Sequence, residues 1–205
     1  MRCRFCHNPE FVLPERLAEM KSDFIPAFAF FKFLDSRKGF LDGVVVCGGE
    51  PTIHNDLPEF LREIKNRGFL VKLDTNGNRP DMVRRVIEER LVDYFAIDVK
   101  QSASKYAPLC GTGASFEKTA ESARLVIESG VDHEFRTTVA KGEHTAADVE
   151  EIARALAGAR RYFLQNYRSG NVLDPDFRAS SFETRELAEF VETASAYVSE
   201  VRMRT

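Results

Sequence analysis

The sequence predicts an α/β fold in which the strands of one sheet run parallel. From residue 42 onward, short β-rich runs alternate with longer helical patterns, and strands separated by such helices pair in parallel through right-handed crossovers. A complete eight-fold barrel takes about 250 residues. The 205 residues of this chain therefore leave two architectures open, an open doubly wound sheet and a partial barrel of about six units.

Each expected element follows from its local pattern of apolar residues. The expected strands are residues 42–47, 69–75, 93–100, 132–140 and 161–168. The expected helices are residues 57–68, 79–91, 115–130, 145–158 and a last one that begins at 184. In the first of these helices, Leu57, Phe60 and Ile64 recur at helical spacing, and Gly68 ends the pattern. Thr145 is placed to cap the fourth helix.

Composition excludes several classes of partner. The 29 basic and 32 acidic residues give a net charge of −3 and are mixed along the chain, so no basic face for nucleic acid is expected. No apolar run approaches the ~20 residues of a membrane span, and no signal-peptide pattern opens the chain. We therefore expect a cytoplasmic protein whose four cysteines are thiols, metal ligands or redox groups rather than disulfides.

Polar residues and glycines gather where the predicted strands end, which is where parallel α/β folds place their functional sites. In chain order these strand-end residues are Cys47-Gly48-Gly49-Glu50, Asp74-Thr75-Asn76-Gly77, Asp98, Lys100, Arg136, Gln165 and Asn166. Two adjacent glycines let a ligand reach backbone amides that a β-carbon would obstruct. The joint placement of these residues favours a ligand site.

Each strand-end feature also has a purely structural alternative. The GGEP and Asn-Gly sequences are common in turns. Asp98 and Lys100 lie on one face of an extended strand, where an internal salt bridge would explain them. Arg136 would clamp a carboxylate or phosphate, or it would pair with Glu134 on the same strand. The sequence leaves these alternatives open.

Cys3 and Cys6 have C-x-x-C spacing, and four interpretations fit it. A zinc half-site would need a second such pair, which Cys47 and Cys110 do not form. The adjoining His7 completes a c-type haem attachment pattern, but that attachment requires export. A thioredoxin-like redox pair would follow a strand, and no strand precedes this pair. The fourth interpretation is iron–sulfur ligation, which also accounts for the strand-end residues.

The motifs together resemble the radical S-adenosylmethionine superfamily. The string CRFCHNPE is similar to the last two cysteines of its C-x3-C-x-Φ-C signature, with Phe5 as the aromatic Φ, and GGEP at 48–51 is similar to its second hallmark. LDTNG, AIDVK and LQNYRSGNVLDPDF most resemble activating proteins of anaerobic ribonucleoside-triphosphate reductase, with pyruvate formate-lyase activating enzymes as near relatives. The resemblance implies one domain over residues 1–205, folded as a partial (β/α)6-type TIM barrel with parallel strands.

The resemblance also implies a cofactor site. Cys3 and Cys6 match two of the three cysteines that hold a 4Fe-4S cluster, with S-adenosylmethionine bound beside it. No catalytic residue is implied beyond these ligands, because the chemistry belongs to the cofactor. The positions implied to bind S-adenosylmethionine are Phe5, His7, Gly48, Gly49, Glu50, Asn76, Asp98, Lys100, Arg136 and Gln165.

The implied activity is the activation of a glycyl-radical enzyme. One-electron reduction cleaves S-adenosylmethionine, and the 5'-deoxyadenosyl radical removes a hydrogen atom from a glycine Cα of the partner. The implied partners are anaerobic ribonucleoside-triphosphate reductase and a flavodoxin- or ferredoxin-type electron donor. Two alternatives stay open: a radical enzyme that acts on a small molecule or a peptide, and a relative without a cluster that serves as a binding protein or scaffold.

The chain departs from the family pattern at its start. The first signature cysteine would lie two positions before Met1, and the strand that delivers the loop would precede it. We expect that this first strand is missing through truncation or a wrong start rather than degeneration, because the other strand-end residues are in place. A chain with two of three ligands is expected to be impaired and to have an exposed sheet edge. Cys47 is expected to be a small core thiol rather than a replacement ligand.

Overall fold

The sheet at the centre of the molecule is entirely parallel. The structure is a computed structural model that describes residues 1–20 and 24–204. Its six strands follow one another across the sheet in chain order, and each neighbouring pair is parallel. They are β1 (Gly43–Val46), β2 (Leu70–Thr75), β3 (Tyr94–Asp98), β4 (Asp132–Val139), β5 (Arg161–Asn166) and β6 (Glu200–Arg204).

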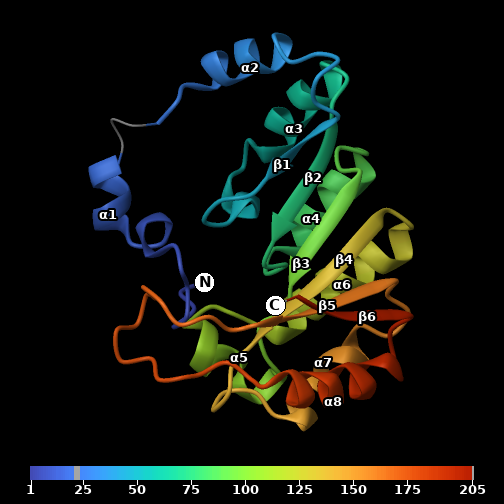
Figure 1. The fold of residues 1–205 in the computed structure, drawn as a ribbon. Helices are drawn as coiled ribbons and strands as arrows, with labels where there is room; N and C mark the ends of the chain where they lie inside the picture. Colours follow the sequence, from blue (N-terminus) through green and yellow to red (C-terminus); the bar gives the residue numbers. More distant parts are fainter. Residues whose placement is uncertain (21–23, 205) are drawn as a thin grey trace.

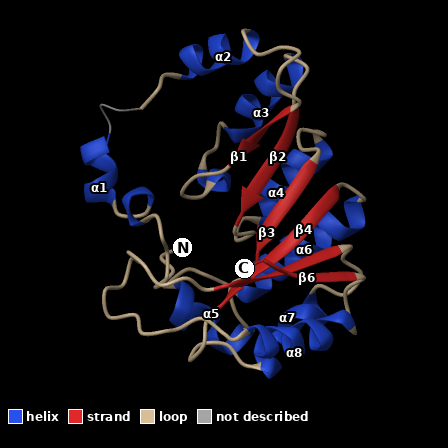
Figure 2. Ribbon diagram, in the orientation of Figure 1, coloured by secondary structure: helices blue, strands red, loops and turns tan. Residues whose placement is uncertain are grey.

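The order of the strands decides between the two architectures that the sequence leaves open. A doubly wound sheet reverses its strand order at a switch point and carries helices on both faces. Here the order β1 to β6 has no reversal, and Figures 1 and 2 show the sheet curving with helices along its outer face. The fold is a partial TIM-type barrel, as expected.

The helices between the strands lie where the periodic patterns place them. The expected helices are α3 (Leu57–Asn66), α4 (Pro80–Glu88), α6 (Phe116–Ser129), α7 (Ala146–Ala155) and α8 (Thr184–Ser195). The sequence did not predict η1 (Pro9–Phe11), α1 (Pro14–Glu19), α2 (Ala27–Asp35), η3 (Pro51–Ile53) and α5 (Ala103–Cys110). No helix in the described ranges is both long and apolar enough to cross a membrane.

The alternation of side chains along the strands separates an apolar layer from a polar one. Leu73, Ile97 and Phe135 are fully buried in the core between the sheet and the helices. Side chains of opposite parity, among them Asp74 and Arg136, line a cavity on the concave face. The concave face of this barrel is therefore polar, which suits it to a charged ligand.

The edge of the sheet at β1 is exposed, as expected. Within the described ranges β1 pairs with β2 alone, and Val45 of β1 is 56% exposed. Apolar side chains that precede β1 in the chain are also open to solvent, since Phe28 of α2 is 75% exposed and Phe40 is 82% exposed. An edge strand with such neighbours is available for pairing with another chain.

The buried carboxylate of Asp148 joins the beginnings of two helices. It forms a capping box with Thr145 at the start of α7 and accepts hydrogen bonds of 2.6 Å from Ser102 and Lys105 at the start of α5. Burial alone would raise the pKa of Asp148, but the hydrogen bonds from Lys105, Ser102 and Thr145 outweigh it and lower the pKa to about 2. The folded state therefore favours the ionised carboxylate.

We expect Asp148→Asn to lower the free energy of unfolding at neutral pH by about 2 kcal/mol, because it weakens charge-assisted hydrogen bonds. Since the pKa of Asp148 is lower in the folded state, its contribution is complete above about pH 4 and is lost as the pH falls toward 2. Urea denaturation across this range measures the effect. The control, Glu192→Gln at an exposed position of α8, should change stability little, and an equal loss in both variants would contradict the prediction.

Candidate functional site

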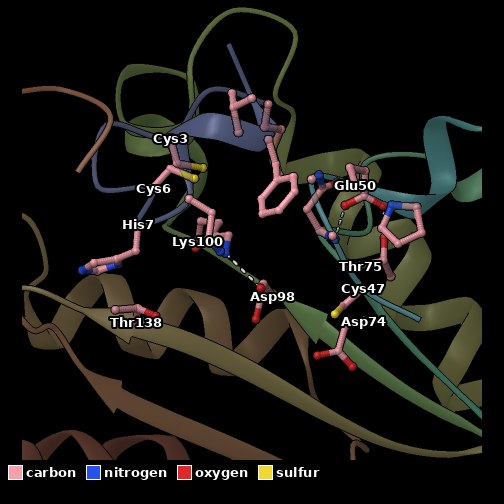
Figure 3. A pocket seen from close by; sticks show the side chains of 18 of the residues that line it. Cys3, Cys6, His7, Cys47, Glu50, Asp74, Thr75, Asp98, Lys100 and Thr138 are labelled. Carbon is pink, nitrogen blue, oxygen red and sulfur yellow. Dashed lines mark hydrogen bonds and ion pairs between the residues drawn. The ribbon is translucent and has the colours of Figure 1, made fainter. Parts of the chain in front are cut away.

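A cavity of about 510 Å3 lies on the concave face of the barrel, at the carboxyl ends of β1 to β4 and below the N-terminal segment (Figure 3). Gln165 is the one predicted site residue outside it, and it lines an adjoining cavity of about 360 Å3. His7 and Thr138 belong to both cavities. The predicted residues that line the main cavity are Cys3, Phe5, Cys6, His7, Gly48, Gly49, Glu50, Asn76, Asp98, Lys100 and Arg136.

The N-terminal segment that carries the cysteines is held on both sides by backbone hydrogen bonds. On one side, the amide of Arg2 donates to the carbonyl of Cys110 at 2.8 Å, and the amide of Arg4 donates to that of Leu109 at 3.0 Å. On the other side, residues 173–174 donate hydrogen bonds of 2.9 Å to carbonyls of the same segment. These contacts fix a chain end that would otherwise fray.

Aromatic packing holds the same segment from below. Phe5 is buried against the rings of Tyr167 and Phe177, with ring centroids 6.4 Å and 5.8 Å away. His7 remains exposed, and its Nε2 lies 2.9 Å from the carbonyl oxygen of Arg168. Phe5 thus contributes both to the core and to the cavity wall, while His7 lies at the cavity rim.

Two thiols of the segment face the cavity (Figure 3). The neighbouring Cys110 thiol lowers the pKa of Cys3 by hydrogen bonding to it, against the opposing effect of burial. Burial raises the pKa of Cys6. The expectation that Cys47 is a core thiol is wrong: it follows the end of β1, where strand alternation stops, and its exposed side chain lines the cavity.

The thiols match part of the donor set of an iron–sulfur cluster. Cys3 and Cys6 lie at the required spacing in one wall of the cavity. In residues 1–20 and 24–204, no group of three histidine, cysteine, aspartate or glutamate side chains is close enough to hold a metal ion. The described chain therefore presents two of the three thiolates in the signature.

A cluster of paired charges forms the floor of the cavity. Arg136 donates hydrogen bonds of 2.8 Å to the carboxylates of Asp98 and Asp74, and Lys100 donates one of 3.0 Å to Asp98. The salt bridge between Asp98 and Lys100 that the sequence allowed is therefore present. The alternative pairing of Arg136 with Glu134 is the looser contact, at 3.7 Å.

The electrostatics of this cluster keep its members charged. Burial opposes the charged form of each group, but mutual attraction outweighs it, so the pKa of Asp98 is lowered while the pKa values of Lys100 and Arg136 are raised. Oδ1 of Asp74 is buried without a hydrogen bond and lies 3.7 Å from the ammonium of Lys72. The cluster presents carboxylates beside fixed cations to the cavity, so it fits a zwitterionic ligand such as an amino acid moiety.

The carboxylate of Glu50 fastens the GGEP loop to the loop after β2. Its Oε1 accepts hydrogen bonds from the hydroxyls of Thr52 and Thr75 at 2.5 Å and 2.6 Å, and its Oε2 accepts one from the amide of Asn76 at 2.8 Å. Glu50, which the sequence placed among ligand-binding positions, lines the cavity and also aligns two of its loops. Asp74 and Thr75 belong to the strand-end residues identified in the sequence but were given no binding role there, and Thr138 was not singled out.

The sequence matches the Radical SAM superfamily over residues 1–156, which is most of the chain. The chain belongs to this superfamily. A protein of Methanocaldococcus jannaschii named as a glycyl-radical enzyme activating enzyme is 30% identical over 211 residues, covering 100% of this chain and 85% of that protein. The pyruvate formate-lyase-activating enzyme of Listeria monocytogenes is 33% identical over 113 residues, covering 49% of this chain and 43% of that enzyme.

Solved structures share the fold of this radical SAM protein. A domain of a pyruvate-formate lyase-activating enzyme from Bacteroides vulgatus has a TM-score of 0.65 at 19% identity, covering 80% of this chain and 99% of that domain. Streptococcus suis SuiB bound to S-adenosylmethionine has a TM-score of 0.69 at 14% identity, covering 88% of this chain and 44% of that protein. Membership in the superfamily implies S-adenosylmethionine and an iron–sulfur cluster as cofactors.

We expect Asp98→Asn to lower the free energy of unfolding by about 2–3 kcal/mol, because it removes the carboxylate that pairs with both Lys100 and Arg136 and leaves Arg136 with Asp74. Chemical denaturation at neutral pH measures this change. The matched control is Asp81→Asn in an exposed ion pair with Arg79, where we expect less than about 1 kcal/mol. Equal effects at the two positions would show that the charge cluster on the cavity floor stabilises the protein no more than an exposed ion pair does.

Proposed function

We propose that this radical SAM protein is the activating enzyme of a glycyl-radical enzyme, with a 4Fe-4S cluster as its cofactor and anaerobic ribonucleoside-triphosphate reductase as its partner. A flavodoxin- or ferredoxin-type protein would donate the electron. The observation that carries the proposal is one cavity in which Cys3 and Cys6 lie across from the charged cluster of Asp98, Lys100 and Arg136. The names of the relatives support the activating class, and the motifs of the sequence support the reductase.

The cavity residues divide into two groups by chemistry. Cys3 and Cys6 would hold the cluster, which when bound supplies the electron that cleaves the sulfonium of S-adenosylmethionine. On the floor, Lys100 and Arg136 are fixed cations that would orient the methionyl carboxylate, and the carboxylates of Asp74 and Asp98 would attract the methionyl amine. The protein would therefore bind and orient the cofactor without transferring a proton itself.

Backbone groups of the GGEP loop would bind the same ligand. Gly48 has a φ of +148°, a conformation that favours glycine, and its position leaves backbone groups open to the cavity. A β-carbon on Gly49 would lie 2.8 Å from the carbonyl oxygen of Phe11. The second glycine thus lets the N-terminal segment close over the loop and keep water away from the reacting groups.

The test of the function is anaerobic reconstitution with iron and sulfide, followed by iron counting and detection of 5'-deoxyadenosine. With two thiolates, we expect substoichiometric iron and slow cleavage of S-adenosylmethionine, both lost in Cys6→Ser and both retained in Cys47→Ser, which has no assigned role. Electron paramagnetic resonance should then detect a glycyl radical on anaerobic ribonucleoside-triphosphate reductase. Cleavage that persists in Cys6→Ser would refute the function.

We expect Gly49→Ala to weaken S-adenosylmethionine binding at least tenfold, because the added methyl group would push the Phe11 carbonyl and its segment away from the loop. Equilibrium dialysis with radiolabelled S-adenosylmethionine measures the affinity. The control is Gly170→Ala, where the nearest atom to an added β-carbon is 3.9 Å away. If both variants bind like the unaltered chain, the loop does not need the close approach of residue 11.

A further inference from the structure

We propose that Cys3 and Cys110 form a reversible disulfide when the site holds no cluster, and that this disulfide withdraws Cys3 from cluster binding until it is reduced. The disulfide itself is inferred from the geometry of the chain. Its effect on cluster binding rests on the proposed function, because it requires Cys3 to be a cluster ligand.

The backbone places the two cysteines against each other. The hydrogen bonds from Arg2 to Cys110 and from Arg4 to Leu109 bracket Cys3, so its backbone lies against the end of α5. Gly111 allows this approach, since its φ is +85° and a β-carbon there would lie 3.2 Å from the carbonyl oxygen of Arg2. Cys3 and Cys110 are both buried in the same cluster of core side chains.

The surroundings of the four thiols single out this pair. Cys110 is fully buried and, unlike the other three cysteines, does not line the cavity, so the proposed function gives it no task. Cys3 is 9% exposed and lines the cavity, where a small oxidant can reach it. Cys47 lies at the end of β1 and is exposed. Cys6 lines the cavity wall with Cys3, which makes a bond between Cys3 and Cys6 the competing outcome.

The oxidant we name is a low-molecular-weight disulfide such as oxidised glutathione. The Cys3 thiolate attacks one of its sulfurs, which forms a mixed disulfide and releases one glutathione thiolate. Cys110 then gives up its proton to that thiolate and attacks the Cys3 sulfur, which releases the second glutathione as a thiolate that takes up from solvent the proton that Cys3 had lost. The protein loses two electrons and two protons in total, and one oxidised glutathione becomes two reduced molecules.

The disulfide has opposite effects on structure and on cofactor loading. It would tie the N-terminal segment covalently to the end of α5, where hydrogen bonds already hold it. It would also remove one of the two thiolates that would hold the cluster. A dithiol that reduces the bond would restore both thiols. The oxidised chain would therefore be inactive, but reduction would make it able to bind the cluster again.

The experiment treats the iron-free chain with oxidised glutathione, blocks free thiols with an alkylating reagent, and maps disulfides by peptide mass spectrometry. We expect a peptide pair that joins Cys3 to Cys110, with Cys6 and Cys47 alkylated. Iron incorporation should fall at least tenfold after oxidation and return after treatment with dithiothreitol. A bond between Cys3 and Cys6, or glutathione retained on Cys3 with Cys110 free, would overturn the proposal.

The variant Cys110→Ser separates the disulfide from other roles of this cysteine, and Cys110→Ala serves if the serine variant does not fold. Either variant should incorporate as much iron as the unaltered chain before oxidation. Loss of iron before oxidation would make Cys110 a cluster ligand and would overturn the proposal. If the disulfide forms but no reduced chain binds iron, the proposed function fails while the pairing of Cys3 with Cys110 stands.

Discussion

A single carboxylate, that of Asp98, holds the cations of the cavity in place. The register between β3 and β4 sets Asp98 beside Arg136, and Arg136 reaches on to Asp74 in β2. Three neighbouring strands are thus connected at their carboxyl ends by charges that could not be buried singly. This network keeps the concave face polar, and a polar face cannot be closed by apolar packing. The N-terminal segment covers it instead, which leaves a cavity between them.

The layout of the fold could be predicted because its helices and strands repeat with regular periods. The strands with buried valine, isoleucine and phenylalanine and the helices with one apolar face were recognised at nearly the observed bounds. β6 was missed, since its alternating charged residues leave Val201 and Met203 as the apolar signal. α5 was missed because Pro108 interrupts it and its apolar face is weak. Strand order, which excludes the doubly wound sheet, depends on long-range pairing that no local pattern specifies.

The site was predictable to the extent that it lies at strand ends. Motifs after successive strands identified most residues of the cavity, because parallel strands present their carboxyl ends at one edge. The bonds from Glu50 to Thr75 and Asn76 were not predictable, since they join loops whose proximity arises only in the folded sheet. The contact between Cys3 and Cys110 has the same origin. Cys47 was predicted to be buried because the expected strand, residues 42–47, extended one residue past the end of β1.

The attachment of the N-terminal segment to late parts of the chain has a consequence for biosynthesis. Residues 2–6 are synthesised before their hydrogen-bonding partners, which lie at residues 109–110 and 173–174. The segment therefore has no docking surface until most of the chain has been translated. During that interval its thiols are solvent-accessible and carry no ligand. Assembly of the cofactor site is consequently a step that follows synthesis, and it depends on the state in which those thiols emerge.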